Sequence, residues 1–369
     1  VVTPTEGVGF LAEGLRNYVE GTSTGEAFLT LYAAYGEKEA WKAVRERLTN
    51  VAFLRYQGVN LSKAAARALY GLTLENSVSR LETYAACAYR HFLQYGLSLE
   101  ERGEFGFESV DMGNVFHAVL ESFAMMLKDS DYTWFDFPKE FGEKKVLEAL
   151  EAYAAEYGAT ILYSNARNEY AITRMARVLT RTVLTLQSQL QKGEFQPDAV
   201  EKSFYYTDDL DSVNVALSEE EKMRLKGRID RIDTAEDEEH VYVKVIDYKS
   251  GSRQFDLAAL YYGLQLQLVV YMNAAMELEA RKHPDKEVVP AALLYYHIED
   301  PTVETPVELS EEELNEEILS KLRMKGVVND SEAVVEKLDR FMGSKSDVIP
   351  VERKKDGSFS ARSSVMSAK

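Results

Sequence analysis

The stretch VYVKVIDYKSG, residues 241–251, constrains the fold more than any other part of the sequence. Its valines recur at every second position, which is the pattern of a strand with one buried face. Because side chains alternate along a strand, Asp247 and Lys249 lie on that same face, at its end. The sequence therefore predicts a buried strand that presents a carboxylate and an ammonium group side by side.

Composition limits the classes of protein that this chain can belong to. The chain has 369 residues and a formal net charge of −18, which argues against broad nonspecific attraction to nucleic acid. The acidic residues are clustered, so local basic surface remains compatible with that charge. A single cysteine, Cys87, excludes an internal disulfide and a multi-cysteine metal site within the chain. No apolar run is long enough to span a bilayer and no secretory signal opens the chain, so we expect a cytoplasmic protein, cut from a longer one.

The periodicity of apolar residues divides the chain into a helical front part and a mixed part. Helices are expected over 9–70, 79–95, 112–128, 140–192 (broken near Gly158), 257–282, 310–324 and 331–342. Strands are expected after residue 193 and over 223–234, 240–249 and 288–298. This order predicts an α/β core with a central mixed sheet, preceded by a helical segment over 1–70.

A second carboxylate is expected close to the first. The segment KGRIDRID, residues 226–233, places Asp230 on the strand that forms a hairpin with the strand of Asp247. Two carboxylates at adjacent strand ends can share Mg²⁺, which prefers oxygen ligands. Lys249 could orient an attacking water and neutralise charge on a phosphate. An isolated Asp-x-Lys is common by chance, and its simpler interpretation is an ordinary salt bridge between Asp247 and Lys249.

Four further residues strengthen the hypothesis of a metal-dependent site. His117 follows Gly113 by one helical turn, and its imidazole could complete a metal shell, although a half-buried structural histidine fits equally. Glu201 lies within an otherwise apolar strand, either paired or at an edge that faces water. Gln267 and Tyr271 are one turn apart on the helix after the Asp-x-Lys strand, a spacing that an ordinary amphipathic helix also shows.

Taken in order, these motifs resemble those of the RecB-type nuclease family of the PD-(D/E)XK superfamily, whose core is restriction-endonuclease-like. The similarity rests on Gly-x-x-x-His at 113–117, Glu201, GRIDRID, DYKSG and Gln-x-x-x-Tyr at 267–271. It implies a metal-dependent DNA exonuclease in which Lys249 positions the attacking water and Glu201 assists it. Gln267 and Tyr271 would fix the core and the strand being cut. The implied ligands of Mg²⁺ or Mn²⁺ are Asp230, Asp247, His117 and the backbone carbonyl of Tyr248.

A second segment, residues 77–102, resembles the opening segment of the AddB family of nuclease subunits. That resemblance implies a heterodimer with an AddA-type helicase-nuclease, acting on DNA in double-strand break repair and recombination. It also implies that Cys87 is one ligand of a 4Fe-4S cluster in the full-length protein, the other three cysteines lying after residue 369. Residues 71–369 would form the nuclease domain, and 1–70 would be the tail of a helicase-like region.

Contact with DNA requires basic side chains on this acidic chain. Four arginines are spaced so that they follow one helix face and could track a phosphate backbone, although a solvated face is an equally good interpretation. These residues are Arg167, Arg174, Arg177 and Arg181.

Two other functions remain open on the sequence alone. A stand-alone iron–sulfur exonuclease of the CRISPR-adaptation type shares these motifs but is usually shorter. A catalytically silent DNA-binding or scaffolding module is also compatible with the fold, although Asp230, Asp247 and Lys249 are all intact.

Overall fold

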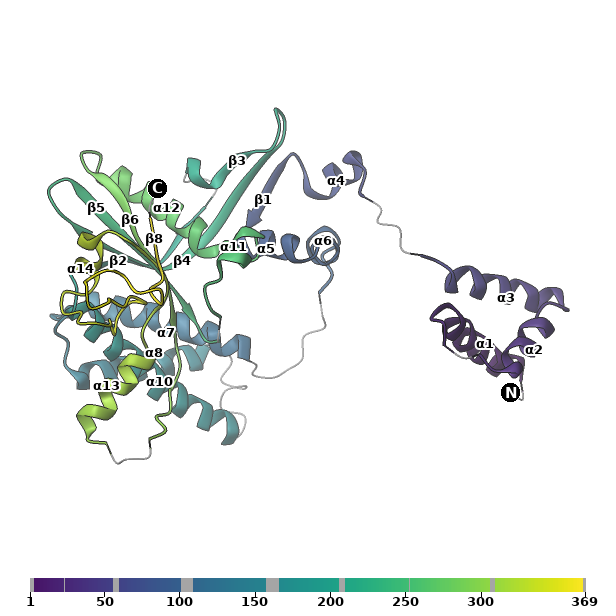
Figure 1. Cartoon of the computed structure of the whole chain (residues 1–369), viewed down its shortest axis with the longest axis horizontal. Coiled ribbons are helices and arrows are strands. Elements are labelled where there is room, and N and C mark those ends of the chain that lie inside the picture. The colour runs from purple at the N-terminus through teal and green to yellow at the C-terminus, as the bar shows by residue number, and fades with distance from the viewer. Residues whose placement is uncertain are drawn as a thin grey trace. The chain divides into compact units, whose positions relative to one another are not determined.

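The computed structural model describes residues 3–22, 24–55, 60–100, 109–156, 166–205, 210–251, 253–305 and 309–367. The chain divides into two compact units, Val1–Ala66 and Arg67–Lys369 (Figure 1). The expected helix break near Gly158 lies outside the described residues.

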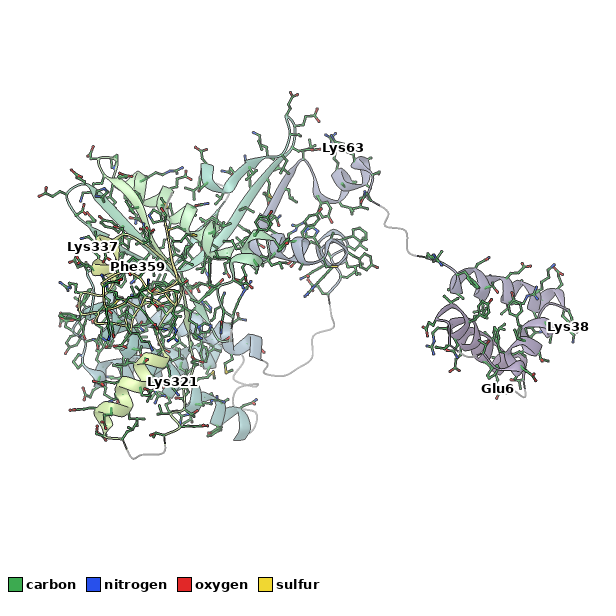
Figure 2. All side chains as sticks on the ribbon, in the orientation of Figure 1. Glu6, Lys38, Lys63, Lys321, Lys337 and Phe359 are labelled. Carbon is green, nitrogen blue, oxygen red and sulfur yellow. The ribbon has the colours of Figure 1, made fainter. Side chains whose placement is uncertain are left out.

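The first unit is helical, as the sequence predicts. Its helices are α1 (Pro4–Val19), α2 (Glu26–Ala34), α3 (Glu39–Ala52) and the start of α4 (Lys63–Tyr70). Thr3 and Glu6, the latter labelled in Figure 2, form a capping box in which each side chain accepts a hydrogen bond from the other residue's backbone N–H. A small core of Leu11, Leu15, Phe28 and Tyr35 holds α1 and α2 together.

The second unit is built on one mixed sheet. Its strands are β1 (Thr73–Ser77), β2 (Gln196–Phe204), β3 (Asn214–Ala216), β4 (Lys222–Glu236), β5 (His240–Lys249), β6 (Glu287–His297), β7 (Lys325–Asn329) and β8 (Val365–Met366). The strand order is β1-β4-β5-β6-β7-β8, and β2 and β3 also pair with β4. The β4–β5 pair is antiparallel and the β5–β6 pair is parallel. The predicted α/β fold with a central mixed sheet is confirmed.

Helices cover both faces of this sheet (Figure 1). The α-helices described in this unit after α4 are α5 (Val78–Ala86), α6 (Ala88–His91), α7 (Ser109–Lys128), α8 (Lys139–Glu156), α10 (Ala166–Gln191), α11 (Leu257–Tyr261), α12 (Gln267–Lys282), α13 (Glu311–Lys321) and α14 (Glu332–Leu338). Helices α7, α8 and α10 share one hydrophobic core with one face of the sheet, and α12 packs on the other face. Within the described ranges, no helix is long and apolar enough to cross a membrane.

Two expectations from the sequence are wrong in detail. The helix expected over 79–95 is interrupted at Cys87, where the backbone is extended (φ −163°, ψ 105°). The helix expected over 257–282 ends at Tyr261, and Gly263 then takes a left-handed conformation (φ 74°) that a helix cannot continue through. Strand β5 is buried, as expected, and its even-numbered residues also pack into the core shared with α7, α8 and α10, as those of central strands commonly do.

Candidate active site

The two predicted carboxylates meet where β4 and β5 diverge. The β4–β5 ladder begins at the pair Arg231–Ile246, so Asp230 is the residue just before it. Asp230 turns its carboxylate toward β5, where Oδ2 accepts a hydrogen bond of 2.7 Å from the backbone N–H of Tyr248. This bond fixes Asp230 beside the end of β5, next to Asp247. Both side chains are almost completely buried.

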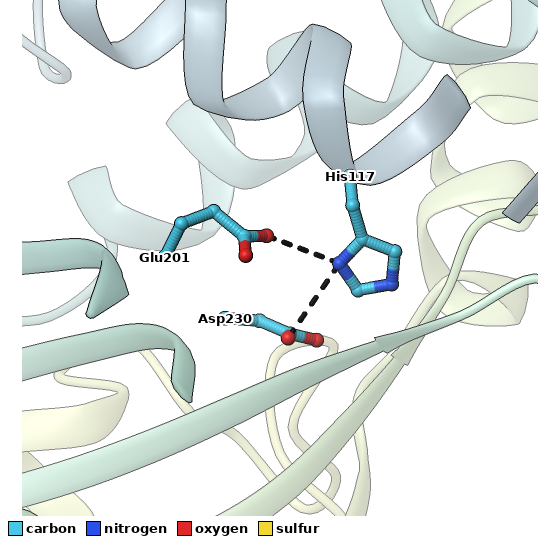
Figure 3. Close-up of side chains that lie close together, drawn as sticks. All are labelled: His117, Glu201 and Asp230. Carbon is cyan, nitrogen blue, oxygen red and sulfur yellow. Dashed lines mark hydrogen bonds and ion pairs between the residues drawn. The ribbon is translucent and has the colours of Figure 1, made fainter. Parts of the chain in front are cut away.

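Three side chains from three different elements converge at this point (Figure 3). His117 Nδ1, from α7, lies 3.1 Å from Glu201 Oε1 on β2 and 3.5 Å from Asp230 Oδ1 on β4. One ligand atom from each residue lies within 4.8 Å of the others, close enough to hold one metal ion. We refer to His117, Glu201 and Asp230 as the acidic cluster.

The backbone of Glu201 is strained in a way that serves this cluster. Its φ of 50° is left-handed, a region that residues other than glycine rarely occupy. The β2–β4 register runs through this position without a shift, and the carboxylate is buried beside His117. Arg228, on β4, lies with its Nε 2.7 Å from Glu201 Oε2. Such strain is most often found at functional sites.

A second group of predicted residues forms a chain of polar contacts beside the cluster. Lys249 Nζ lies 2.5 Å from Asp247 Oδ2 and donates a hydrogen bond of 3.0 Å to Gln267 Oε1. Gln267 Nε2 in turn donates a hydrogen bond of 3.2 Å to the hydroxyl of Tyr271. The structure therefore brings together Asp247, Lys249, Gln267 and Tyr271. Among the described residues, only the three members of the acidic cluster have ligand atoms that all lie within 4.8 Å of one another, and Asp247 is not one of them.

Burial and mutual repulsion set the charge states of these groups. Burial raises the pKa of Asp230 to about 8, and the charges of Asp247 and Glu201 contribute to that rise against the effect of His117. Burial also raises the pKa of Asp247, although Lys249 opposes that shift. Burial alone would lower the pKa of His117, but the hydrogen bond to Glu201 and the nearby carboxylates outweigh it and raise that pKa. Two buried carboxyl groups thus hold their protons unusually tightly when no cation is bound.

The donor set fits a hard divalent cation. Carboxylate oxygens and an imidazole nitrogen are suitable ligands, and the clustered carboxylates repel one another unless a cation neutralises them. Asp247 Oδ1 is buried and has no hydrogen-bond partner among the described residues. A buried oxygen without a partner is costly, and a bound cation would satisfy it.

A buried ion-pair network lies behind the site and was not predicted from the sequence. Arg231, which follows Asp230, places its Nε 2.6 Å from Asp233 Oδ1, and Lys244 Nζ lies 2.8 Å from Asp233 Oδ2. The Arg231 guanidinium also lies over the ring of Trp134, 4.8 Å from its centroid. Burial alone would raise the pKa of Asp233, but the two cations outweigh it and lower that pKa. This network joins β4 to β5 close along both strands to Asp230 and Asp247.

The other predicted binding residues are Cys87 and the arginines on α10. On α10, Arg177 and Arg181 both form ion pairs with Asp300, so they are already partly neutralised. Arg174 is exposed, and the side chain of Arg167 lies outside the described residues. Cys87 is exposed at the junction of α5 and α6, where its sulfur accepts a hydrogen bond of 3.4 Å from the backbone N–H of Arg90.

Comparison with known proteins agrees with this geometry. The family model described as the PD-(D/E)XK nuclease superfamily matches residues 75–361, and the chain belongs to that superfamily. Curated relatives named as the B subunit of an ATP-dependent helicase/deoxyribonuclease confirm the predicted similarity to AddB. The relative from Lachnoclostridium phytofermentans is 43% identical over 98% of this chain and 31% of its own length. Those from Alkaliphilus metalliredigens and Bacillus mycoides are 35% and 36% identical, over 99% and 100% of this chain and 32% of their own lengths. The chain thus spans about a third of the relatives that it matches.

Proposed function

We propose that this chain is the nuclease domain of an AddAB-type helicase-nuclease and hydrolyses phosphodiester bonds in DNA during double-strand break repair and recombination. The observation that carries the proposal is the acidic cluster, buried beside the Asp247–Lys249 pair at the end of β5. The similarity to the AddB relatives extends over almost the whole chain, which favours this function over a stand-alone exonuclease. A cytoplasmic location and an AddA-type partner follow from the same proposal.

In this proposal, His117, Asp230 and Asp247, with the carbonyl of Tyr248, hold Mg²⁺ or Mn²⁺, and Glu201 is close enough to join them. When bound, the cation supplies positive charge that polarises the scissile phosphate. Lys249 places a second positive charge at the same point, where negative charge develops in the transition state. Its ammonium group also orients the attacking water, and Gln267 and Tyr271 hold that ammonium group in place.

The direct test is cleavage of end-labelled single-stranded DNA by the purified chain, with Mg²⁺ and with EDTA. We expect cleavage products only when the metal is present. Asp230→Asn should remove the activity, because it removes a central ligand. Equal cleavage in EDTA, or full activity of Asp230→Asn, would contradict the proposal.

Metal binding should depend strongly on pH. The pKa of Asp230 is about 8 in the folded chain, against an ordinary value of 3.8, so the folded state keeps a proton that the unfolded state loses. Between about pH 4 and pH 8 the metal-free protein should therefore lose stability as the pH rises. Protons compete with the cation, so apparent Mn²⁺ affinity should increase on the order of 50-fold from pH 6 to pH 8. Thermal melts with and without Mn²⁺ at both pH values measure this, and an effect of Mn²⁺ independent of pH would refute it.

We also propose that Cys87 is a cluster ligand in a chain that carries the C-terminal cysteines of the AddB family. One thiolate cannot hold a cluster that requires four, so residues 1–369 should purify without iron. The longer chain, prepared without oxygen, should be brown and more heat-stable, and Cys87→Ala should remove the colour and most of that gain. The exposed position of Cys87 supports this role. Unchanged iron content in Cys87→Ala would show that the cysteine has no such role.

A further inference from the structure

A row of basic side chains leads along β4 to the acidic cluster. Lys222, Arg224, Lys226 and Arg228 occupy alternate positions of the strand, and all four are exposed. The residues between them include Met223 and Leu225, which pack into the core under α12. The alternation therefore gathers the cations on one face, and the next alternate position is Asp230. We call these four residues the β4 row.

The β4 row lies beside a hollow lined by aromatic and basic side chains. Strand β1 pairs with the first part of β4 and shares its exposed face. The hollow has a volume of about 530 Å³, and its lining includes Tyr70, Tyr95, Arg80, Lys226 and the acidic Glu75. The guanidinium of Arg80 lies 4.9 Å from the ring centroid of Tyr95 and 5.7 Å from that of Tyr70. Aromatic rings next to cations are the combination with which proteins hold unpaired bases.

Charges around the row allow it to bind an anion. Glu75, on β1, is the acidic residue opposite Arg224 in the β1–β4 ladder, but among the described residues no ion pair joins the two. At the other end, Arg228 pairs with Glu201 and so joins the row to the acidic cluster. Beyond the start of the row, Arg67 pairs with Glu220 and Glu221. Within the described ranges, neither Lys222 nor Arg224 forms an ion pair with a carboxylate, so at least these two cations of the row are open to an anion.

We propose that the β4 row binds the phosphates of a single DNA strand and directs that strand into the acidic cluster. This inference rests on the proposed nuclease function and specifies its substrate. Alternate residues of a strand are about 6.6 Å apart, a step similar to that between successive phosphates of an extended nucleic-acid strand. The hollow gives unpaired bases a place beside the tyrosines. A duplex keeps its bases stacked inside and gains nothing from that hollow.

The test is the salt dependence of single-strand binding in EDTA, which prevents metal-dependent cleavage. The double variant Arg224→Gln/Lys226→Gln loses two phosphate contacts. The slope of log affinity against log salt should therefore fall by about 1.4, and affinity for a labelled oligothymidylate should fall on the order of 50-fold at about 50 mM salt. The matched control is Lys354→Gln/Lys355→Gln, which removes two exposed cations from the C-terminal segment. The control should bind as the wild type does, and a thermal melt checks that both variants fold.

A small substrate separates this inference from the proposed function. A single phosphodiester with nitrophenyl groups is too short to reach from the acidic cluster to Arg224, so the double variant should hydrolyse it at the wild-type rate. If the wild type hydrolyses neither substrate, the proposed nuclease function is refuted. Binding measured in EDTA would still show whether the β4 row binds single-stranded DNA. Unchanged binding by the double variant, or equal competition by duplex DNA, would refute the proposed binding of a single strand by the β4 row. So would a loss of binding in Arg174→Gln with none in the double variant.

Discussion

Lys249→Ala should reduce the rate of DNA cleavage by at least about 10²-fold while leaving the affinity for Mn²⁺ unchanged or slightly increased. The Lys249 ammonium group contacts Asp247 and Gln267, so the structure places it beside the expected ligands without making it a ligand. Its loss removes charge from the transition state, and it also removes a cation that competes with the metal. Cleavage assays and Mn²⁺ titrations of the same variant measure the two effects separately.

A matched control for this variant is Lys286→Ala. Lys286 forms an ion pair of 2.9 Å with Glu236 near the start of β6, which pairs with the start of β5. It is therefore at the end of β5 far from Lys249, and its removal should change neither cleavage nor metal affinity. Wild-type cleavage by Lys249→Ala in Mg²⁺ would show that its ammonium group has no part in the reaction.

Asp230→Asn should have opposite effects on the metal-free and metal-bound proteins. In the metal-free chain, burial and the neighbouring carboxylates disfavour the charge on Asp230. Removing that charge at a pH above about 8 should raise the melting temperature, by roughly 2–4 °C for each kcal/mol gained. The same change should abolish the stabilisation by millimolar Mn²⁺, because that stabilisation requires binding to the folded state.

The comparison with Asp233→Asn makes this prediction specific. Asp233 lies further along β4 and is also buried, but it is paired with Arg231 and Lys244. Its loss leaves two buried cations uncompensated, at a cost of about 3–5 kcal/mol. Asp233→Asn should therefore lower the melting temperature with and without Mn²⁺. If both variants are destabilised in the absence of metal, Asp230 has the structural role of a paired core residue instead.

Local sequence patterns were sufficient to predict the strands and helices that carry the site. Alternating apolar residues identified β5, and the spacing of Gln267 and Tyr271 identified one face of α12, where both contact each other as expected. The left-handed conformation of Glu201 could not be predicted, because glutamate rarely takes it and no local sequence signal marks it. Strand β1 is not among the expected strands, because its short, polar sequence gains stability only by pairing with β4.

The basic residues also show the limit of prediction from local sequence patterns. The sequence KMRLKGR carries cations at alternate positions, a signal that is visible once β4 is known to be exposed on one face there. The arginines of α10 have an equally regular spacing, yet Asp300 pairs with two of them. Spacing predicts a shared face, but only the tertiary structure shows which acidic residues lie against that face.

We propose that one divalent cation is held where β4, β5, β2 and α7 meet, and anomalous scattering from crystals grown with Mn²⁺ would locate it. We predict a single strong peak in contact with His117 and Asp230, which disappears in Asp230→Asn. Mn²⁺ bound only elsewhere, or no peak at these residues at millimolar Mn²⁺, would show that these four elements do not hold the cation.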